Sequence, residues 1–219
     1  MTRKLVVARM PMASTEAKET FIKFLSDASD YALENEPGIK KYAICLPRDE
    51  PDSNVVYAVE EYQDEATFDS HMATDGVKRM MSWISSGSRF DGTPEINQLA
   101  MIDGFHFSRP QVNSAKDPHV LFADLSYHPA GVVKALPYWQ AVVDTGRNDE
   151  PGTWVYAVNK DPTNENRICV LETYETPEYL TEVHVPSHAI QESIKNTKDL
   201  RTGLKHTKLK LVKGFLHRD

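Results

Sequence analysis

Two tyrosine–histidine pairs occur at similar spacing in the two halves of this chain, and their side chains could donate or accept a proton. His71 follows Tyr62, and His184 follows Tyr174, at nearly the same spacing. A free imidazole has a pKa near 6.5, which suits a proton acceptor at neutral pH. A phenol can donate a hydrogen bond to a substrate oxygen. These side chains could therefore deprotonate a weak acid and hold its anion, and a purely packing role for each of them is the alternative.

The four side chains belong to an internal repeat. Glu36-Pro37-Gly38 recurs as Glu150-Pro151-Gly152, 114 residues further along. Glu60-Glu61-Tyr62 is echoed by Glu172-Thr173-Tyr174 at an offset of 112, and the two histidines follow at an offset of 113. Because the offsets between the matching residues differ by no more than two residues, we interpret the chain as two copies of one unit.

Copy one is predicted to fold in the order strand, helix, strand, strand, helix, strand. Ser14 and Asp64 are candidate caps for its two helices. Glu36-Pro37-Gly38 ends the first helix, because proline cannot continue a helix and glycine permits the turn. The expected strands are residues 4–10, 38–46, 54–62 and 97–107, and the expected helices run from residue 14 to 36 and from 64 to 83.

Copy two repeats this order. Pro137 should kink or interrupt its first helix. Strand alternation should place Trp154, Tyr156 and Val158 on one face. The polar segment 108–118, which holds two prolines, is expected to link the copies. The expected strands are residues 119–127, 153–160, 167–175 and 204–216, and the expected helices cover residues 130–144 and 177–195.

This order of elements defines a ferredoxin-like unit, whose helices cover only one face of its sheet. The other face must be covered as well, and a second copy of the unit can cover it. We therefore predict an α+β fold in which tandem ferredoxin-like (βαββαβ) repeats form an intramolecular pseudo-dimeric α+β barrel. The predicted domains are residues 1–107 and 119–219, with 108–118 as the linker.

Composition and charge exclude several classes of protein. A formal net charge of −7 argues against a nucleic-acid partner, whose phosphates would be repelled. No run of about 18 apolar residues predicts a membrane span, and no secretory leader is recognisable. Cys45 and Cys169 lie singly in apolar runs and are predicted to be reduced, buried thiols of a cytoplasmic protein. No metal site is predicted, because Pro186 separates His184 from His188 and no third ligand is evident.

The residues around the repeated anchors resemble the antibiotic biosynthesis monooxygenase (ABM) family, within the dimeric α+β barrel group. The resemblance is carried by Glu-Pro-Gly, a strand with Tyr42 or Tyr156, a strand that ends in tyrosine, and a histidine on the following helix. It is strongest over residues 36–77 and extends over residues 150–190. The family includes enzymes that oxidise quinols, anthrones and related phenols with O2 and no cofactor. It also includes haem-degrading members, and related barrels act as lactone isomerases or cyclases.

The resemblance implies roles for particular residues. In copy one His71 would act as the base and Tyr62 as the hydrogen-bond donor, and we expect the active pocket in this copy. His184 and Tyr174 would form a second site or a structural counterpart. Candidate walls of the substrate pocket are Tyr42, Phe68, Trp154 and Tyr156.

The chain departs from the family pattern at two places, and each departure argues against one type of reaction or cofactor known in the family. The asparagine that some quinol oxygenases carry on the hairpin strand is replaced by Ala58 and Val170. The axial histidine of the haem-degrading relatives is replaced by Met81 and Ile194, which argues against haem. No glycine-rich phosphate loop is present, so NAD, FAD and ATP have no recognisable site.

We therefore expect a cofactor-independent monooxygenase or oxidase that acts with O2 on an aromatic phenol, quinol or anthrone of polyketide-like secondary metabolism. The expected partners are a small aromatic substrate and O2, with no nucleic acid and no membrane. The chain would act as a monomeric pseudo-dimer or as a homodimer of it. The alternatives are a cofactor-free isomerase, cyclase or dehydratase on the same barrel, and a non-catalytic binding or scaffold protein.

Overall fold

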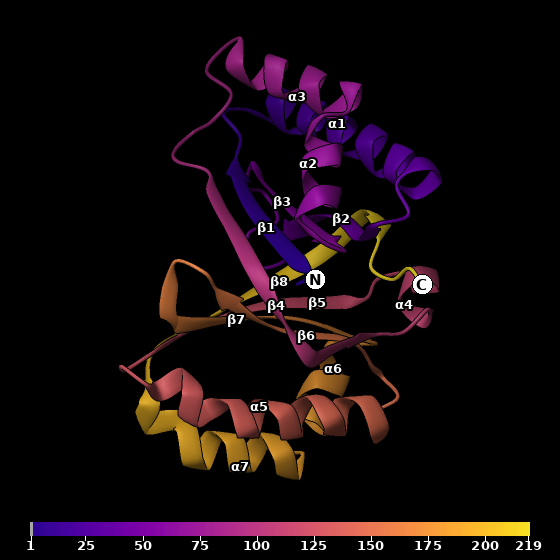
Figure 1. Cartoon of the computed structure of the whole chain (residues 1–219). Coiled ribbons are helices and arrows are strands. Elements are labelled where there is room, and N and C mark those ends of the chain that lie inside the picture. Colours follow the sequence, from indigo (N-terminus) through magenta and orange to yellow (C-terminus); the bar gives the residue numbers. More distant parts are fainter. Residues whose placement is uncertain (1) are drawn as a thin grey trace. The chain divides into compact units, whose positions relative to one another are not determined.

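The chain folds into two units, each built on an antiparallel sheet with helices on one face (Figure 1). The computed structural model describes residues 2–219. Unit 1 contains the chain up to Gln98 together with Lys210–Asp219, and unit 2 contains Leu99–Leu209. The strands β4 (Glu95–Ser108) and β8 (Arg201–Phe215) therefore each begin in one unit and end in the other.

The sheet of unit 1 has β3 at its centre, paired antiparallel to β1 and to β2. The first residues of β4 lie next to β1, and the last residues of β8 lie next to β2. The strands of this unit are β1 (Lys4–Pro11), β2 (Ile39–Pro47) and β3 (Val55–Tyr62), and its helices are α1 (Thr15–Asn35), α2 (Glu65–Met72) and α3 (Asp75–Ser85).

Side-chain caps fix where the helices of unit 1 begin. The Ser14 hydroxyl accepts the backbone N–H of Ala17 at 3.1 Å, and a carboxylate oxygen of Asp64 accepts that of Thr67 at 2.8 Å, as predicted. The predicted helix 64–83 is instead divided into α2 and α3. The Thr74 hydroxyl donates to the His71 carbonyl at 2.8 Å, which ends α2, and it caps α3 as well.

Unit 2 repeats this arrangement with β7 between β5 and β6. Within residues 100–108 β4 pairs with β6, with a register shift between Met101 and His106, and the first part of β8 lies next to β5. Helix α5 (Gly131–Asn148) runs through Pro137, so the expected interruption is wrong. The other elements are α4 (Gln111–Ser114), β5 (His119–Tyr127), β6 (Thr153–Asp161), β7 (Asn164–Tyr174), α6 (Pro177–Tyr179), the π-helical turn η1 (Leu180–His184), α7 (His188–Thr197) and the 3-10 turn η2 (Lys198–Leu200).

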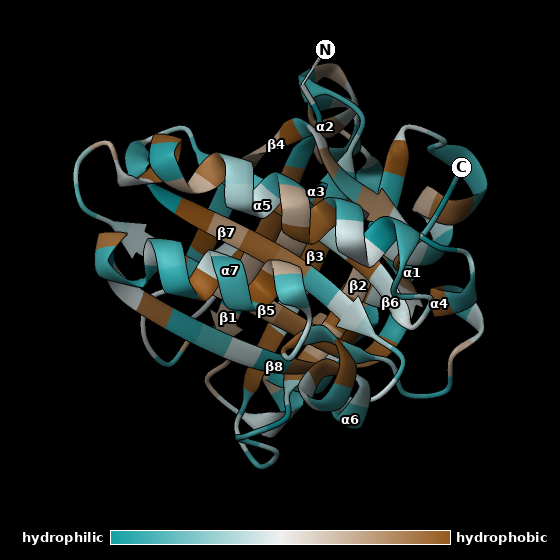
Figure 2. Cartoon of the chain, turned by 90° about the horizontal axis from the view of Figure 1, so that it is seen from below, coloured by the Kyte–Doolittle hydropathy of each residue, from teal (hydrophilic) through white to brown (hydrophobic). Residues whose placement is uncertain are grey.

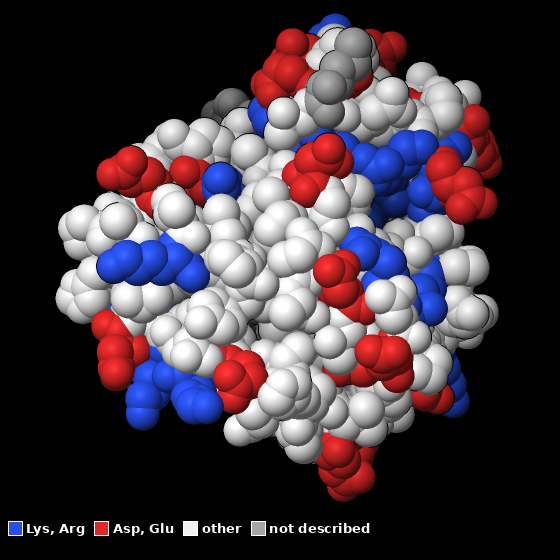
Figure 3. All heavy atoms as spheres, turned by 60° about the horizontal axis from the view of Figure 1, so that its bottom comes forward, with Lys and Arg blue, Asp and Glu red and all other residues white. Residues whose placement is uncertain are grey.

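Each unit has its own apolar core between sheet and helices. In Figure 2 the outer sides of α5 and α7 are mostly teal or white, whereas β5 and β7 behind them are largely brown. Cys45 and Cys169 are buried free thiols, as predicted, and burial raises the pKa of each to about 12. On the face drawn in Figure 3, Lys and Arg side chains lie among Asp and Glu side chains.

The strand order identifies both copies as the predicted ferredoxin-like α+β repeat. The order is β4-β1-β3-β2 in copy one and β8-β5-β7-β6 in copy two. Gly214 allows β8 to approach β2 in unit 1, because its φ is +105° and a Cβ there would lie 1.9 Å from the Tyr42 carbonyl oxygen. Within residues 2–219 no helix is long and apolar enough to cross a membrane.

Candidate functional site

The predicted histidines and tyrosines meet in each copy, between the sheet and the helices. In copy one the His71 ring lies 5.6 Å from the Tyr42 ring and 5.7 Å from the Tyr62 ring, measured between centroids. All three side chains are buried. In copy two the corresponding centroids are 5.5 Å apart for Tyr156 and His184 and 5.0 Å apart for Tyr174 and His184, and these rings are also buried.

A glutamate at the start of each repeated Glu-Pro-Gly motif hydrogen-bonds to the histidine of its copy. The Glu36 carboxylate lies 2.9 Å from Nδ1 of His71, and the Glu150 carboxylate lies 2.7 Å from Nδ1 of His184. Both glutamates begin the Glu-Pro-Gly turn. In copy two this turn is pressed against α6, since a Cβ on Gly152 would lie 2.3 Å from the Tyr179 ring.

A second glutamate in each copy accepts from the strand-end tyrosine. The Tyr62 hydroxyl donates to the Glu60 carboxylate, and the Tyr174 hydroxyl donates to the Glu172 carboxylate at 2.7 Å. Tyr156 also hydrogen-bonds to Glu172. The sequence signal for these residues was a glutamate inside an apolar strand, which is rarely buried without a partner.

A hydrogen bond to Glu150 orients the His184 ring in copy two. Burial alone would raise the pKa of Glu150, but hydrogen bonds from His184, Thr153 and Ser187 together lower it. The ionised Glu150 carboxylate therefore accepts a hydrogen bond from Nδ1–H of His184. We assign this tautomer from the hydrogen-bond network. It leaves Nε2 as the acceptor nitrogen of His184.

The neighbouring groups of copy two stay protonated more readily than usual. Burial raises the pKa of Glu172, although the nearby His184 and the hydrogen bond from Tyr174 oppose this. Burial, together with the Glu172 charge, raises the pKa of Tyr156 and Tyr174 well above the ordinary value. The two phenols therefore remain neutral hydrogen-bond donors.

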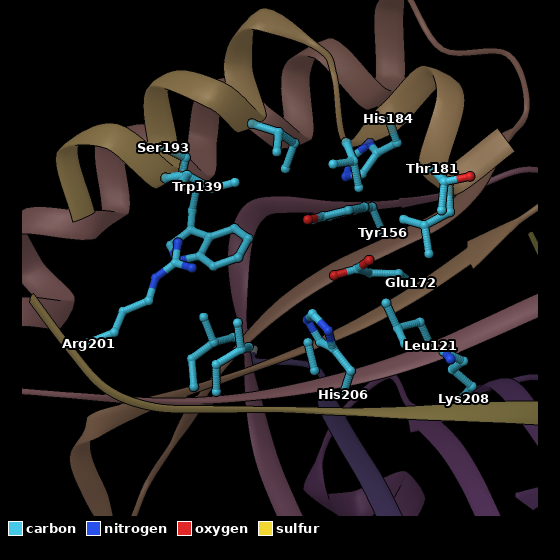
Figure 4. A pocket seen from close by; sticks show the side chains of 17 residues that line it. Leu121, Trp139, Tyr156, Glu172, Thr181, His184, Ser193, Arg201, His206 and Lys208 are labelled. Atoms are coloured by element: carbon cyan, nitrogen blue, oxygen red, sulfur yellow. The ribbon is translucent and has the colours of Figure 1, made fainter. Parts of the chain in front are cut away.

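In copy two this cluster lines a sizeable apolar cavity. The cavity has a volume of about 300 Å³ and lies between the sheet, η1 and α7. In Figure 4 Tyr156 lies between His184 and Glu172, while Arg201 and Trp139 lie on the other side of the space. The residues that line the cavity are Leu121, Ala123, Leu125, Trp139, Tyr156, Glu172, Leu180, Thr181, His184, Val185, Ile190, Ser193, Ile194, Arg201, Leu204, His206 and Lys208.

One residue in the wall of this cavity, Ser193, is smaller than its counterpart in copy one. The offset of 113 between the helix caps Thr74 and Ser187 pairs Met80 with Ser193. Met80 packs on the core around Tyr42 and Tyr62. In copy one a methionine side chain therefore occupies the position at which Ser193 leaves space in copy two.

The remaining predicted residues of copy one lie around this packed core. Phe68 stands edge-on to Tyr62, with ring centroids 5.2 Å apart, and the Lys4 ammonium lies 4.1 Å above the Phe68 ring. His71 lines a different hollow of about 270 Å³, together with Asp27, Asp75 and Arg79. That hollow has a far more polar lining than the cavity of copy two.

Trp154 is set apart from the other predicted wall residues by a β-bulge. The register of β6 against β7 shifts between Thr153 and Val155, so Trp154 interrupts the alternation that would have aligned it with Tyr156. The equivalent Lys40 occupies a bulge in β2. Tyr156 lines the cavity, but Trp154 does not.

Copy two has one more residue than copy one between the strand-end tyrosine and the histidine. The wider π-helical turn η1 accommodates this additional residue. The backbone N–H of Val185 donates to the carbonyl of Leu180 at 2.9 Å, five residues back rather than four. This wider turn lets His184 reach Glu150 as His71 reaches Glu36, despite the additional residue. No group of three His, Cys, Asp or Glu side chains suited to a metal ion occurs among residues 2–219.

Fold and site together define a tandem ferredoxin-like protein with a Glu–His–Tyr cluster in each copy. Residues 5–83 match the family model for antibiotic biosynthesis monooxygenases, so this part of the chain belongs to that family, as the sequence predicted. The match supports an enzyme of the monooxygenase type. No curated protein matches the chain.

Three solved structures share the fold over nearly the whole chain. A candidate monooxygenase of Lactobacillus acidophilus NCFM is 14% identical with a TM-score of 0.80, and 100% of each chain is covered. A candidate monooxygenase of Fusobacterium nucleatum subsp. nucleatum ATCC 25586 is 18% identical with a TM-score of 0.80, covering 99% of this chain and 97% of that one. An anthrone oxidase-like protein is 10% identical with a TM-score of 0.61, covering 96% and 92%. At these identities the likeness is one of fold alone.

Proposed function

We propose that the chain is a cofactor-independent monooxygenase or oxidase that acts with O2 on an aromatic phenol, quinol or anthrone, and that its active site lies in copy two. The observation that carries this proposal is the Glu150–His184 pair in the wall of an apolar cavity of about 300 Å³. This volume is at the lower end of the range for small-molecule sites, about 300–1,000 Å³. The sequence had favoured copy one, whose equivalent volume is packed with side chains.

The first step of the proposed reaction is a proton transfer. Nε2 of His184 takes a proton from the acidic position of the substrate, and the Glu150 carboxylate stabilises the imidazolium that forms. The neutral Tyr156 phenol presents a proton to the oxygen on which the negative charge collects. The apolar walls exclude water, which strengthens these interactions.

The substrate anion then reduces O2, so no cofactor has to carry electrons. For an anthrone-like CH2 group, one electron passes to O2, the two radicals combine, and the peroxide takes the proton from His184. His184 then removes the second C–H proton, the O–O bond breaks, and hydroxide leaves as water with that proton. The CH2 group and O2 have become C=O and H2O.

An assay of O2 consumption tests this proposal directly. The purified chain, freed of metals by a chelator and of flavin by dialysis, is mixed with anthrone and with hydroxylated anthrones in an oxygen electrode. We expect uptake of one O2 per ketone formed, and no product under argon. Product under argon would instead support an isomerase, cyclase or dehydratase, and no turnover of any tested phenol would support a binding protein.

Filling the cavity should abolish ligand binding without unfolding the chain. Ser193→Met installs the residue that copy one has at the equivalent position, where Met80 packs on the core. We expect loss of aromatic ligand binding, measured by quenching of tryptophan fluorescence, and a melting temperature that is unchanged or raised. Ser85→Met on the exposed end of α3 is the matched control. Binding that survives Ser193→Met would place the ligand elsewhere.

A further inference from the structure

Basic side chains of β8 line the cavity of copy two, and the proposed proton transfer does not use them. Arg201 lies at the Trp139 side of the cavity, whereas His206 and Lys208 lie on the side of Glu172 (Figure 4). Glu172 is the one carboxylate among the lining residues, and burial raises its pKa. Basic side chains therefore outnumber carboxylates in the lining of the cavity, in a chain whose formal net charge is −7.

Arg201 is fixed by hydrogen bonds, but not all of its N–H groups are used in them. Its Nη2 donates to the Thr197 hydroxyl at 2.9 Å, and it also hydrogen-bonds to the Tyr127 phenol. Neither partner carries a negative charge. Its Nε is buried and has no hydrogen-bond partner among residues 2–219. The charge of the Arg201 guanidinium therefore has no anionic hydrogen-bond partner in the cavity wall, and an anionic ligand could supply one.

The polar ends of the cavity lie apart. Figure 4 shows the Arg201 guanidinium beside Trp139, and His184 and Glu172 on the opposite side, with the apolar walls between them. Trp139 also donates to the Tyr127 hydroxyl at 3.0 Å, so that Tyr127 joins the indole and the guanidinium into one fixed group. A flat ring system that reaches from His184 to Trp139 would bring a substituent to Arg201.

We propose that the end of the cavity at Arg201 and Trp139 is a carboxylate-binding subsite, and that the substrate is an aromatic acid rather than a neutral phenol. Arg201 would bind the substrate carboxylate through its guanidinium, while the acidic C–H or O–H of the ring system faces His184. This inference rests on the proposed function for the position of the reacting atom, but the binding of the carboxylate can be tested without turnover.

Calorimetric titration with a matched ligand pair provides the test. Naphthalene-2-carboxylate and its uncharged carboxamide have the same ring system and differ in charge. We expect the unaltered chain to bind the carboxylate roughly 10- to 100-fold more tightly than the carboxamide at low salt. We expect Arg201→Gln to remove this preference and Arg201→Lys to restore part of it. Arg147→Gln, an arginine of the same unit outside the cavity, should leave it unchanged.

Several outcomes would overturn the subsite. Equal binding of the two ligands by the unaltered chain refutes it without any variant, as does the absence of binding by both at millimolar concentration. A preference that persists in Arg201→Gln, with circular dichroism showing a folded chain, assigns the carboxylate to another residue. If the carboxylate binds through Arg201 but no O2 is consumed with any aromatic acid, the subsite stands and the oxygenase proposal fails.

Discussion

Replacing His184 by glutamine is expected to lower kcat/KM for O2 consumption roughly 100- to 10,000-fold, the usual contribution of a general base. The glutamine amide can still donate a hydrogen bond to Glu150, so the turn and the π-helical segment keep their contact. It cannot accept the substrate proton. Initial rates in the oxygen electrode, with the binding of the aromatic ligand measured in parallel, separate loss of the base from loss of the cavity.

The matched control for this variant is His71→Gln. His71 and His184 have the same exposed fraction of 2%, and each is bonded through Nδ1 to a glutamate. The two substitutions should therefore destabilise the chain to a similar degree, which urea unfolding can measure. Only His184→Gln should abolish turnover. If His71→Gln removes the activity and His184→Gln does not, the active site belongs to copy one.

The repeat and its elements could be predicted because they depend on local patterns. The strand 119–127 has the predicted bounds, and Ser14 and Asp64 cap their helices, because apolar runs and cap residues act within a few residues of themselves. The division of the helix 64–83 was not predicted. It depends on Thr74, whose hydroxyl competes for the His71 carbonyl, and helix propensity does not register that competition.

The candidate site could be predicted only in part. Tyrosines and histidines were recognised by their spacing, but Glu36 and Glu150 act across 35 and 34 residues of sequence, so only the folded chain pairs them with a histidine. The cavity is lined by side chains from segments far apart in the sequence, such as Leu121, Tyr156 and Ser193, so local patterns do not reveal it. A one-residue bulge at Trp154 likewise changes which side chains share a face.

The two copies also differ in how they fill one cross-strand position of the sheet. In copy one Lys41 on β2 faces Glu61 on β3, and both are buried. The Lys41 ammonium contacts the Glu61 carboxylate, and Arg3 donates to the same carboxylate at 2.8 Å. In copy two the same register pairs Val155 with Thr173. One fold thus supports both an ion pair and a largely apolar pair at this position.

Lys41→Val should destabilise unit 1 strongly, because it leaves Glu61 buried with only one cation. Removing one partner of a buried ion pair costs about 3–5 kcal/mol, and we expect about 3 kcal/mol here because Arg3 remains. The measurement is the free energy of unfolding in urea. The double variant Lys41→Val/Glu61→Thr, which copies the pair of unit 2, should regain most of the loss. If the double variant is as unstable as the single one, the charge of Glu61 is not the cause.

The Lys41–Glu61 pair should make the free energy of unfolding depend on pH in the acidic range. Burial alone would raise the pKa of Glu61, but Lys41 and Arg3 together lower it below its value in the unfolded chain. The ionised carboxylate therefore stabilises the fold fully above the unfolded-state pKa, near 4.3, and this stabilisation is lost as the pH falls through the folded-state value. The double variant has no carboxylate there, so its stability should fall less than that of the unaltered chain between neutral pH and pH about 3. Parallel slopes of the two proteins over that range would show that Glu61 titrates alike in the folded and unfolded states, contrary to the contacts of its carboxylate with Lys41 and Arg3.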